Sequence, residues 1–313
     1  MERPDPAIRL LAADDLDEAF GLSTTAGWNQ RIADWRMLLE LAPAGAFTAV
    51  AGDRIVGTAI GIDYGTFGWI AMMLVDPAWR GRGIGARLLE AAMGALPPEI
   101  PIRLDATPLG RPLYRRYGFQ DECQLTRHVT GATRAAVEPT PADAARHVRR
   151  LTPADLPSVI AHDDRIFGAH RRILLEWALG RAPHYAQAIE TGAGIHYCFG
   201  RAGRLFDQIG PVVADDETAP ALVSAALAAA EGRAVVVDAF DRYTGFTGWL
   251  RSSGFAASRP LFRMQRQPRT SAASERRRTE RGLGPPRVSL SGSSRGEAPR
   301  ERMQRAIFGP EFA

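Results

Sequence analysis

Three short segments of this chain recur in the same order, and this internal repeat constrains the fold more than any other sequence feature. Residues 148–156 resemble residues 8–16, Val213 matches Val75 at the end of an apolar run, and Gly254-Phe255 matches Gly118-Phe119. The matching positions lie about 140 residues apart each time, so the phase of the repeat is kept. Three matches in register indicate that one domain was duplicated, and 313 residues suffice for two domains of ordinary size.

Each copy is predicted to be a mixed α/β unit. The spacing of apolar residues in the first copy gives the order β-α-α-β-β-β-α-β-α-β. The predicted strands are residues 8–11, 47–51, 54–62, 69–75, 102–106 and 119–129. One helix is predicted to begin after Asp14 or Asp15, and three further helices are predicted at residues 29–41, 84–96 and 112–117. Residues 69–75 are apolar throughout, which is typical of a strand buried on both faces.

The composition divides the chain into five segments. We expect a first domain at residues 1–130, a linker rich in Ala, Thr and Pro at 131–147, and a second domain at 148–266. Residues 267–302 are rich in Arg, Ser and Pro and nearly lack core-forming residues, so we predict disorder there. The apolar segment 303–313 is predicted to pack on the second domain.

The charge and the apolar pattern exclude several classes of protein. All 39 basic residues are arginine, and the net charge of +4 comes from the part after residue 266, so the predicted domains carry no basic excess that would indicate nucleic-acid binding. No apolar run approaches the roughly 20 residues that span a membrane, and the first residues lack a signal-peptide pattern. We therefore expect a cytoplasmic protein. The two cysteines and six histidines show no metal-ligand spacing, so no metal site is predicted.

A glycine-rich segment between the strand at 69–75 and the following helix has the properties of an anion site. Successive backbone N–H groups at such a junction point toward one anion, and the helix terminus adds partial positive charge. Glycine permits the backbone angles that this requires. The residues of this segment, called here the anion loop, are Arg80, Gly81, Arg82, Gly83, Ile84, Gly85 and Ala86.

The anion loop does not have the pattern of a nucleotide-binding loop. It lacks GxxxxGK[ST], and as GxGxxG it fails because Ala86 stands where the third glycine belongs. The spacing Arg80-x-x-Gly83-x-Gly85 after a V-x-P strand end instead resembles the acetyl-CoA signature of the GNAT superfamily of N-acetyltransferases. The resemblance implies a mostly antiparallel central sheet flanked by helices in each domain, and acetyl-CoA as co-substrate.

A second motif extends the resemblance. Residues 113–119 read L-Y-x-x-x-G-F, as in GNAT proteins, where the tyrosine protonates the leaving thiolate of coenzyme A. Tyr114 has that position, and a phenol is protonated at neutral pH. The family pattern also implies that the strand carrying Met73, Leu74 and Val75 diverges from its neighbour and pairs with the pantetheine arm. An N–H of Leu74 or Val75 would polarise the thioester carbonyl. Thr107 stands where many relatives have asparagine, and no general base is identified.

The acceptor side is expected between the first two helices. Trp28, Asn29 and Asp34 lie there and would offer an aromatic wall with polar groups for an amine. A hydrophobic contact that holds the second helix to the sheet explains the tryptophans equally well. Asp105 is a further candidate, as a relay for the proton of the amine.

The second copy lacks both motifs. Residues 218–223, which match the anion loop, contain no glycine and follow three acidic residues. Leu250 stands at the position of Tyr114, counted back from Gly254-Phe255. The second domain is therefore predicted to be a degenerate GNAT-like domain that does not use acetyl-CoA.

These features predict an N-acetyltransferase that passes acetyl from acetyl-CoA directly to a primary amine of a small molecule or peptide. The expected partner is a small-molecule amine, without membrane or nucleic acid, for a monomer or homodimer. One alternative is a regulatory protein that binds acetyl-CoA as a signal without turnover. A second alternative is a nucleic-acid-associated protein that uses the arginine-rich tail.

Overall fold

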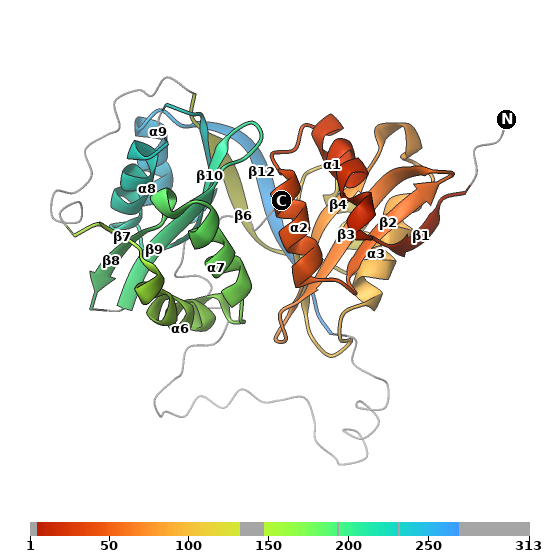
Figure 1. The fold of residues 1–313 in the computed structure, drawn as a ribbon, viewed down its shortest axis with the longest axis horizontal. Helices are drawn as coiled ribbons and strands as arrows, with labels where there is room; N and C mark the ends of the chain where they lie inside the picture. The colour runs from red at the N-terminus through yellow and green to blue at the C-terminus, as the bar shows by residue number, and fades with distance from the viewer. Residues whose placement is uncertain (1–4, 132–146, 193, 231, 269–313) are drawn as a thin grey trace, which may run out of the picture.

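The computed structural model describes residues 5–131, 147–192, 194–230 and 232–268, as two halves that lie side by side (Figure 1). The first half, residues 5–131, contains β1 (Ala7–Leu10), α1 (Leu16–Thr25), α2 (Ile32–Leu41), β2 (Ala46–Ala51), β3 (Arg54–Asp63), β4 (Gly68–Val75), α3 (Ile84–Gly94), β5 (Ile102–Ala106), α4 (Arg111–Arg116) and β6 (Gln120–Val129). This is the order that the sequence predicts, and the mixed α/β class is confirmed.

The second half repeats this order of elements. Its elements are β7 (Arg149–Arg150), α6 (Leu156–Phe167), α7 (Arg172–Arg181), β8 (Gln187–Thr191), β9 (Gly194–Arg201), β10 (Asp207–Val213), α8 (Ala219–Ala228), β11 (Val235–Phe240), α9 (Thr244–Ser252) and β12 (Ala256–Arg266). Most of the predicted linker, the predicted disordered tail from residue 269 onward and the segment 303–313 lie outside the described residues.

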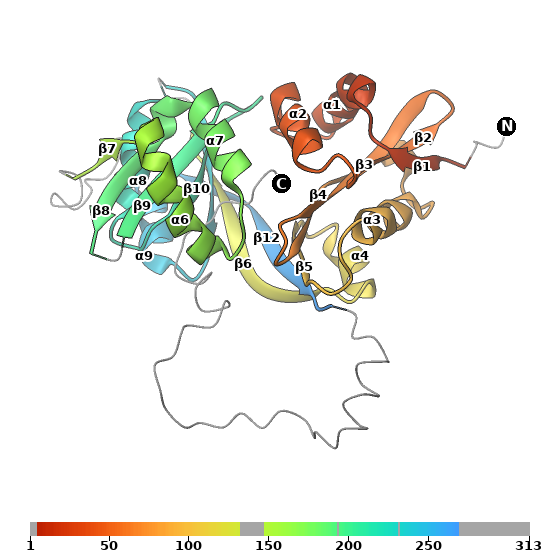
Figure 2. The same cartoon turned by 60° about the horizontal axis from the view of Figure 1, so that its bottom comes forward.

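The strands of both halves form one sheet of twelve strands, in the order β1-β2-β3-β4-β5-β12-β6-β11-β10-β9-β8-β7. Most neighbours are antiparallel, and the exceptions are the parallel pairs β4–β5 and β10–β11. The last strand of each half lies beside the fifth strand of the other half: β12 pairs with β5, and β6 pairs with β11. Figure 2 shows these two exchanged strands, β6 and β12, running side by side between the halves.

The exchange gives the two halves a common core on one face of the sheet. One continuous cluster of buried side chains there joins α1, α2 and β4 of the first half to α6, α7 and β9 of the second half, with Trp35, Trp69, Leu175 and Tyr197 among its members. On the opposite face each half has a core of its own, under α3 and α4 in the first half and under α8 and α9 in the second. The halves are therefore joined by backbone pairing and by buried apolar contact.

Two loop contacts connect the halves in a nearly symmetric manner. The loop between β3 and β4 rests on the second half, where Thr66 Oγ1 donates to the Gly168 carbonyl at 2.5 Å and the rings of Tyr64 and Phe67 pack against Phe167. The loop between β9 and β10 rests in turn on the first half, where it meets the loop between α1 and α2. Each helix-pair loop is thereby held by a strand loop of the other half.

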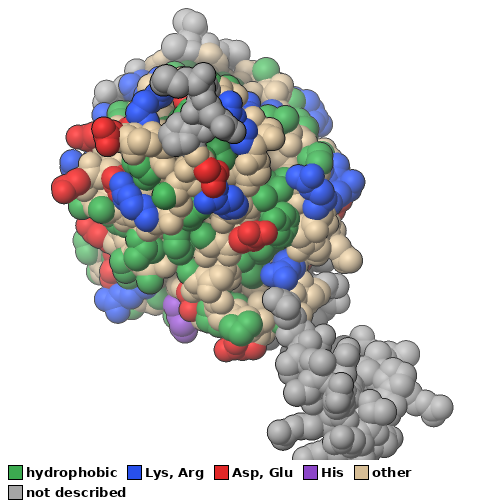
Figure 3. All heavy atoms as spheres, turned by 90° about the vertical axis from the view of Figure 1, so that its right-hand side faces the viewer, with side chains coloured by type: hydrophobic (Ala, Val, Ile, Leu, Met, Phe, Trp, Pro, Cys, Tyr) green, Lys and Arg blue, Asp and Glu red, His purple; other side chains and the backbone are tan. Residues whose placement is uncertain are grey.

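The described residues contain no helix that is long and apolar enough to cross a membrane. On the side of the first half that Figure 3 shows, arginine and acidic side chains are interspersed with apolar ones. Within the described residues, no group of three His, Cys, Asp or Glu side chains is placed to hold a metal ion.

Candidate functional site

A bulge interrupts β4 close to the end that faces the anion loop. Thr58 is opposite Leu74 but Ile60 is opposite Ala71, so two residues of β4 face a single residue of β3. Met72, in this bulge, is the one described non-glycine residue with a positive φ, at 51°. Thr58 Oγ1 donates to the Met72 carbonyl at 2.8 Å. The bulge therefore redirects the backbone of Met73, Leu74 and Val75.

The same strand diverges from its other neighbour. The parallel pairing of β4 with β5 consists of two residue pairs, Gly68 with Ile102 and Trp69 with Arg103. Beyond these pairs the two strands continue to Val75 and Ala106 without a common register. This opening between β4 and β5, called here the fork, is the divergence that the family resemblance implies. Along the fork β4 offers backbone donors and acceptors to a ligand.

The anion loop follows β4 through a short turn. The Asp76 carboxylate accepts the Ala78 N–H at 2.8 Å and so caps the 3₁₀ turn Pro77–Trp79. Gly81 and Gly83 then have φ values of 77° and 75°, which favour glycine. A Cβ at either glycine would meet no protein atom within 4 Å, so backbone conformation, not space within the protein, calls for glycine here.

Helix α3 begins in the anion loop, and its first N–H groups have no hydrogen-bond partner among the residues that the structure describes. Its first internal hydrogen bond runs from Arg87 N to the Gly83 carbonyl at 3.1 Å, so the N–H groups of Ile84, Gly85 and Ala86 precede it. No side chain caps the helix at Gly83. Arg80 and Arg82 are exposed beside these groups, with Arg80 Nε donating to the Val75 carbonyl at 3.1 Å and Arg82 lying 5.2 Å from the Trp79 ring. The loop thus combines free donors, a helix terminus and two cations.

Tyr114 lies on α4, on the same face of the sheet as α3. It is buried in the core that also contains Ile84, and its ring meets the Phe119 ring edge-on at 6.0 Å. Burial raises the pKa of Tyr114 above its ordinary value, because the phenolate would lose its water. The hydroxyl is therefore protonated at neutral pH.

The predicted cofactor residues come together around this core. A Cβ on Gly85 would lie 3.6 Å from both Val75 Cγ2 and Leu113 Cδ2, so the anion loop, the end of β4 and helix α4 meet there. Met73 and Val75 pack against the core that contains Tyr114. Thr107 holds the turn into α4, since its carbonyl accepts the Gly110 N–H at 3.1 Å and the Arg111 N–H at 3.0 Å.

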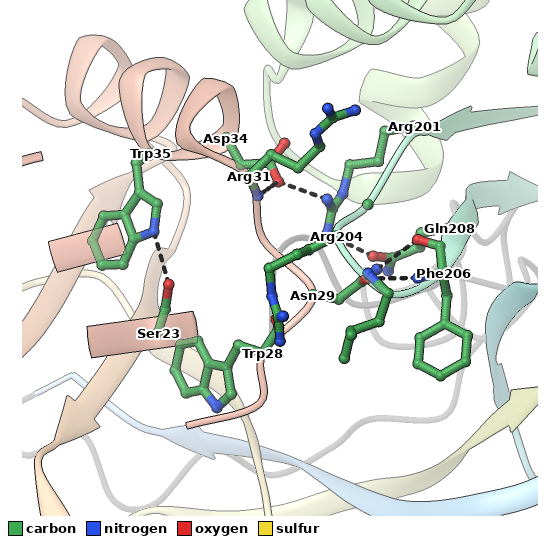
Figure 4. A network of polar contacts seen from close by, with 12 residues as sticks. Ser23, Trp28, Asn29, Arg31, Asp34, Trp35, Arg201, Arg204, Phe206 and Gln208 are labelled. Carbon is green, nitrogen blue, oxygen red and sulfur yellow. Dashed lines mark hydrogen bonds and ion pairs between the residues drawn. The ribbon is translucent and has the colours of Figure 1, made fainter. Parts of the chain in front are cut away.

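Of the predicted acceptor residues, Trp28 and Asn29 join the two halves. The Asn29 amide accepts the Leu205 and Phe206 N–H groups at 2.9 and 3.0 Å and donates to the Phe206 carbonyl at 3.0 Å. Arg204 Nε donates to the Trp28 carbonyl at 3.0 Å. Figure 4 shows these residues between the α1–α2 loop and the second half. Asn29 therefore connects the two halves by hydrogen bonds, a role that the sequence did not predict.

Asp34 also contacts the second half. Its carboxylate pairs with Arg201 at 2.6 Å and accepts the Arg31 N–H at 2.7 Å, and both charged side chains are buried (Figure 4). Burial raises the pKa of Asp34 even beside Arg201, because the carboxylate has lost its water. Gln30 is buried, and neither polar atom of its side-chain amide has a hydrogen-bond partner within the described part of the chain. A substrate role for Trp28, Asn29 or Asp34 stays a prediction.

Asp105 lies on β5 beyond Arg103, which is the last residue of β5 that pairs with β4. Its carboxylate receives two hydrogen bonds from Arg263 of the exchanged strand β12, at 2.9 and 2.8 Å. The Asp105 side chain is 0% exposed and that of Arg263 5% exposed, so the carboxylate is held in a buried ion pair. The predicted proton relay through Asp105 stays a prediction, whereas the ion pair is a role that the sequence analysis missed.

The second half retains the strand scaffold of this site but has a different loop after it. β10 has a register shift between Ile209 and Val212, as β4 has, and it pairs with β11 only from Asp207 to Ile209. Where the anion loop would be, Asp215 accepts the N–H and the hydroxyl of Thr218 at 2.9 and 2.7 Å. Asp216 accepts the Phe246 N–H of α9 at 3.0 Å, so a carboxylate connects this loop to α9. These acids would repel a diphosphate.

Comparison with known proteins agrees with this geometry. Two family models, each described as an acetyltransferase (GNAT) domain, match residues 43–121 and 159–277. The holothin acyltransferase of Pseudoalteromonas sp. is 26% identical over 244 residues, which are 76% of this chain and 80% of that protein.

Solved structures share the fold. A putative acetyltransferase from Pyrococcus horikoshii superposes with a TM-score of 0.67 at 20% identity, over 85% of this chain and 90% of that one. A tandem GNAT protein from the clavulanic acid biosynthesis pathway superposes with a TM-score of 0.55 at 14% identity, over 85% of this chain and all (100%) of that one. One model of the family matches in each half, and the chain therefore belongs to the GNAT acetyltransferases, as an acyltransferase with two GNAT domains in tandem.

Proposed function

We propose that this protein transfers the acetyl group of acetyl-CoA to a primary amine of a small molecule or peptide, at a single site in its first half. The observation that carries the proposal is the pairing of an uncapped helix terminus at Gly83 with an open fork beside it. Such a terminus binds a diphosphate, and the fork accepts an extended arm along β4. Coenzyme A joins these two chemical features in one molecule.

The residues that would hold acetyl-CoA follow from this arrangement. The N–H groups of Ile84, Gly85 and Ala86 would face the diphosphate, with Arg80 and Arg82 adding positive charge. The backbone of Met73, Leu74 and Val75 would pair with the pantetheine arm, because β4 has no strand partner along the fork. Bound acetyl-CoA supplies the thioester whose carbonyl carbon the amine attacks.

Groups of the protein would then stabilise the negative charge that develops on the thioester oxygen and protonate the leaving sulfur. An N–H of Leu74 or Val75 would donate to the thioester carbonyl oxygen as negative charge develops on it. As the carbon–nitrogen bond forms and the carbon–sulfur bond breaks, Tyr114 would give its proton to the leaving sulfur. The attacking amine would lose its proton to solvent, directly or by the predicted relay through Asp105, whose carboxylate is paired with Arg263. No covalent enzyme intermediate is required.

The acceptor is proposed to be an amine on the basis of the family and of the relatives. One relative is named for acyl transfer to holothin. The acceptor would enter from the face of the sheet that carries α1 and α2, because α3 and α4 cover the other face of the fork. On that face the partly buried Trp28 and Cys123 pack against the core shared by both halves.

The substitution Gly83→Asp tests the proposal. A carboxylate at the helix terminus would repel the diphosphate, so acetyl-CoA is expected to bind at least about 100-fold more weakly, a loss of about 2.7 kcal/mol. At subsaturating acetyl-CoA, the rate at which coenzyme A thiol is released in the presence of a panel of amines should fall together with this affinity. Calorimetry for binding and thiol titration for turnover measure the two effects.

Gly65→Asp is the matched control, because Gly65 also has a positive φ, 81°, and open space around its Cα, but lies in the turn at the opposite end of β4. This variant carries the same backbone strain and the same added charge, and it should bind acetyl-CoA as the wild type does. Equal affinity in the wild type and Gly83→Asp, or no transfer to any amine by the wild type, would show that the proposed function is wrong.

A further inference from the structure

Two buried ion pairs occupy equivalent positions in the two halves and cross from one half to the other. Arg263 on β12 is opposite Asp105 on β5, and Arg127 on β6 is opposite Asp238 on β11. Both arginines donate two hydrogen bonds, at 2.9 and 2.8 Å in the first pair and at 2.7 Å twice in the second. Each exchanged strand therefore brings an arginine to the fifth strand of the other half.

The first of these pairs acts on the fork of the candidate site. β4 leaves β5 after the pair Trp69 and Arg103, but β12 remains paired with β5 over its whole length, from Ile102 to Ala106. Asp105 lies on the part of β5 that is no longer paired with β4. The part of β5 beyond Arg103, called here the free arm of the fork, is therefore paired along its other edge with β12, a strand of the second half.

Arg263 contacts both arms of the fork. Its guanidinium holds Asp105 on the free arm and lies 4.9 Å from the ring of Trp69, where β4 and β5 are last paired. On its other side it lies 5.0 Å from the ring of Phe240, on β11 of the second half. Only 5% of its side chain is exposed, so it is packed closely among these groups. A planar guanidinium with two fixed donors sets the position of its partner more tightly than a single charge does.

From this geometry we infer that Arg263 is a positioning residue for acetyl transfer in the first half, acting through Asp105. The inference rests on the proposed function. The second half, which has lost the anion loop, supplies the strand and the arginine that keep β5 in place beside the reacting groups. Removing this support leaves the diphosphate contacts of α3 in place but lets the free arm of the fork shift. A shift of about 1 Å at a reacting geometry lowers a rate roughly 100-fold.

The test compares the two symmetric ion pairs in the full chain. The neutral double variant Asp105→Asn with Arg263→Met removes both charges of the first pair, so that no buried charge is left alone. The control, Asp238→Asn with Arg127→Met, makes the same change beside the corresponding diverging strands of the second half, where the anion loop is replaced. We measure kcat, the KM for acetyl-CoA, the acetyl-CoA Kd by calorimetry, and thermal unfolding. In the first variant kcat is expected to fall about 10- to 100-fold with the Kd changed less than about threefold; in the control kcat stays within about twofold of the wild type.

Equal loss of kcat in both double variants, or loss in neither, overturns the inference and leaves the proposed function standing. A raised acetyl-CoA Kd with unchanged kcat overturns it as well. If either double variant does not fold, Arg263→Lys and Arg127→Lys replace them, because lysine keeps the charge and loses the two-point geometry; only Arg263→Lys should lose kcat. A wild type that binds no acetyl-CoA or acetylates no amine overturns the proposed function and this inference together.

Discussion

Replacing Tyr114 with phenylalanine is expected to lower kcat by about 100- to 10,000-fold, which is the usual worth of a general acid. The exchange removes one oxygen from a buried ring and keeps the ring's edge-on contact with Phe119. Because the hydroxyl acts on the leaving sulfur and not on the diphosphate, the acetyl-CoA Kd should change by less than about threefold. Stopped-time assays of thiol release, together with calorimetric binding, measure both quantities.

Tyr117→Phe is the natural control for this experiment. Tyr117 follows the same helix, but its hydroxyl donates to Glu90 at 2.6 Å on the surface of the first half. Its removal should leave kcat within about twofold, since an exposed hydrogen bond contributes little. A protein that only binds acetyl-CoA as a signal would bind it equally in both variants and would show no turnover even as the wild type. Wild-type kcat in Tyr114→Phe would remove Tyr114 from the mechanism.

After the chain is cleaved between the two halves, the two fragments are expected to stay associated as one complex. A protease site inserted between residues 131 and 147 allows cleavage of the folded protein after purification. Each fragment then holds a strand that lies between strands of the other fragment: β12 lies between β5 and β6, and β6 between β12 and β11. The common core of α1, α2, α6 and α7 adds apolar contact. The fragments should co-elute at ~1 µM, which requires at least about 8 kcal/mol of association free energy.

Separation of the nicked fragments on a sizing column under native conditions would contradict the strand exchange. Two independent domains joined by a linker would part in this way. The nicked protein should also keep its rate of acetyl transfer, because the strands around the fork are unbroken. Addition of denaturant before the column provides the reference positions of the two free fragments.

Local sequence patterns predicted the elements of the first half and the glycine-rich turn that precedes α3. The apolar run at 69–75 became the central strand β4, and the glycines at 81 and 83 adopt the positive φ that a turn into a helix requires. These features are encoded within about one strand and one turn of helix, so hydrophobic period and glycine placement suffice to find them. Tyr114 was proposed from the resemblance of residues 113–119 to a family motif, and its catalytic role stays a prediction.

The exchange of β6 and β12 was not predicted, because both pairings place the same apolar residues on the same face of a sheet. Pairing β6 with its own β5 or with the other half's β11 satisfies the same backbone groups, and alternation along the strand does not distinguish the two. The roles of Asn29, Asp34 and Asp105 depend on this choice, since their partners lie in the other half.

The internal repeat nevertheless contained a signal for the cross-half ion pairs. Asp105-Ala106 recurs as Asp238-Ala239, and Leu125-x-Arg127 recurs as Leu261-x-Arg263. An acid and a base that are both duplicated, each on a strand with apolar neighbours, indicate a buried pair in each copy. The segments that mark the repeat most clearly, residues 8–16, Val75 and Gly118-Phe119, lie outside these paired strands.

The second copy keeps the fold of the first copy without its glycine-rich loop. Its bulge and its diverging strands remain, while the loop that follows has acquired Asp215 and Asp216 as caps. A carboxylate that accepts the backbone N–H groups of its own chain satisfies the donors that would otherwise bind an anion. Asp216 extends this to α9, and so the loop is fixed without a ligand.

The number of acetyl-CoA molecules bound per chain tests the account most directly, because the first half has an uncapped anion loop and the second half does not. Calorimetric titration of the full chain is predicted to give one site per chain in the wild type and no measurable site in Gly83→Asp. Two sites per chain, or one site that survives in Gly83→Asp, would place the cofactor outside the loop at residues 80–86 and contradict the assignment.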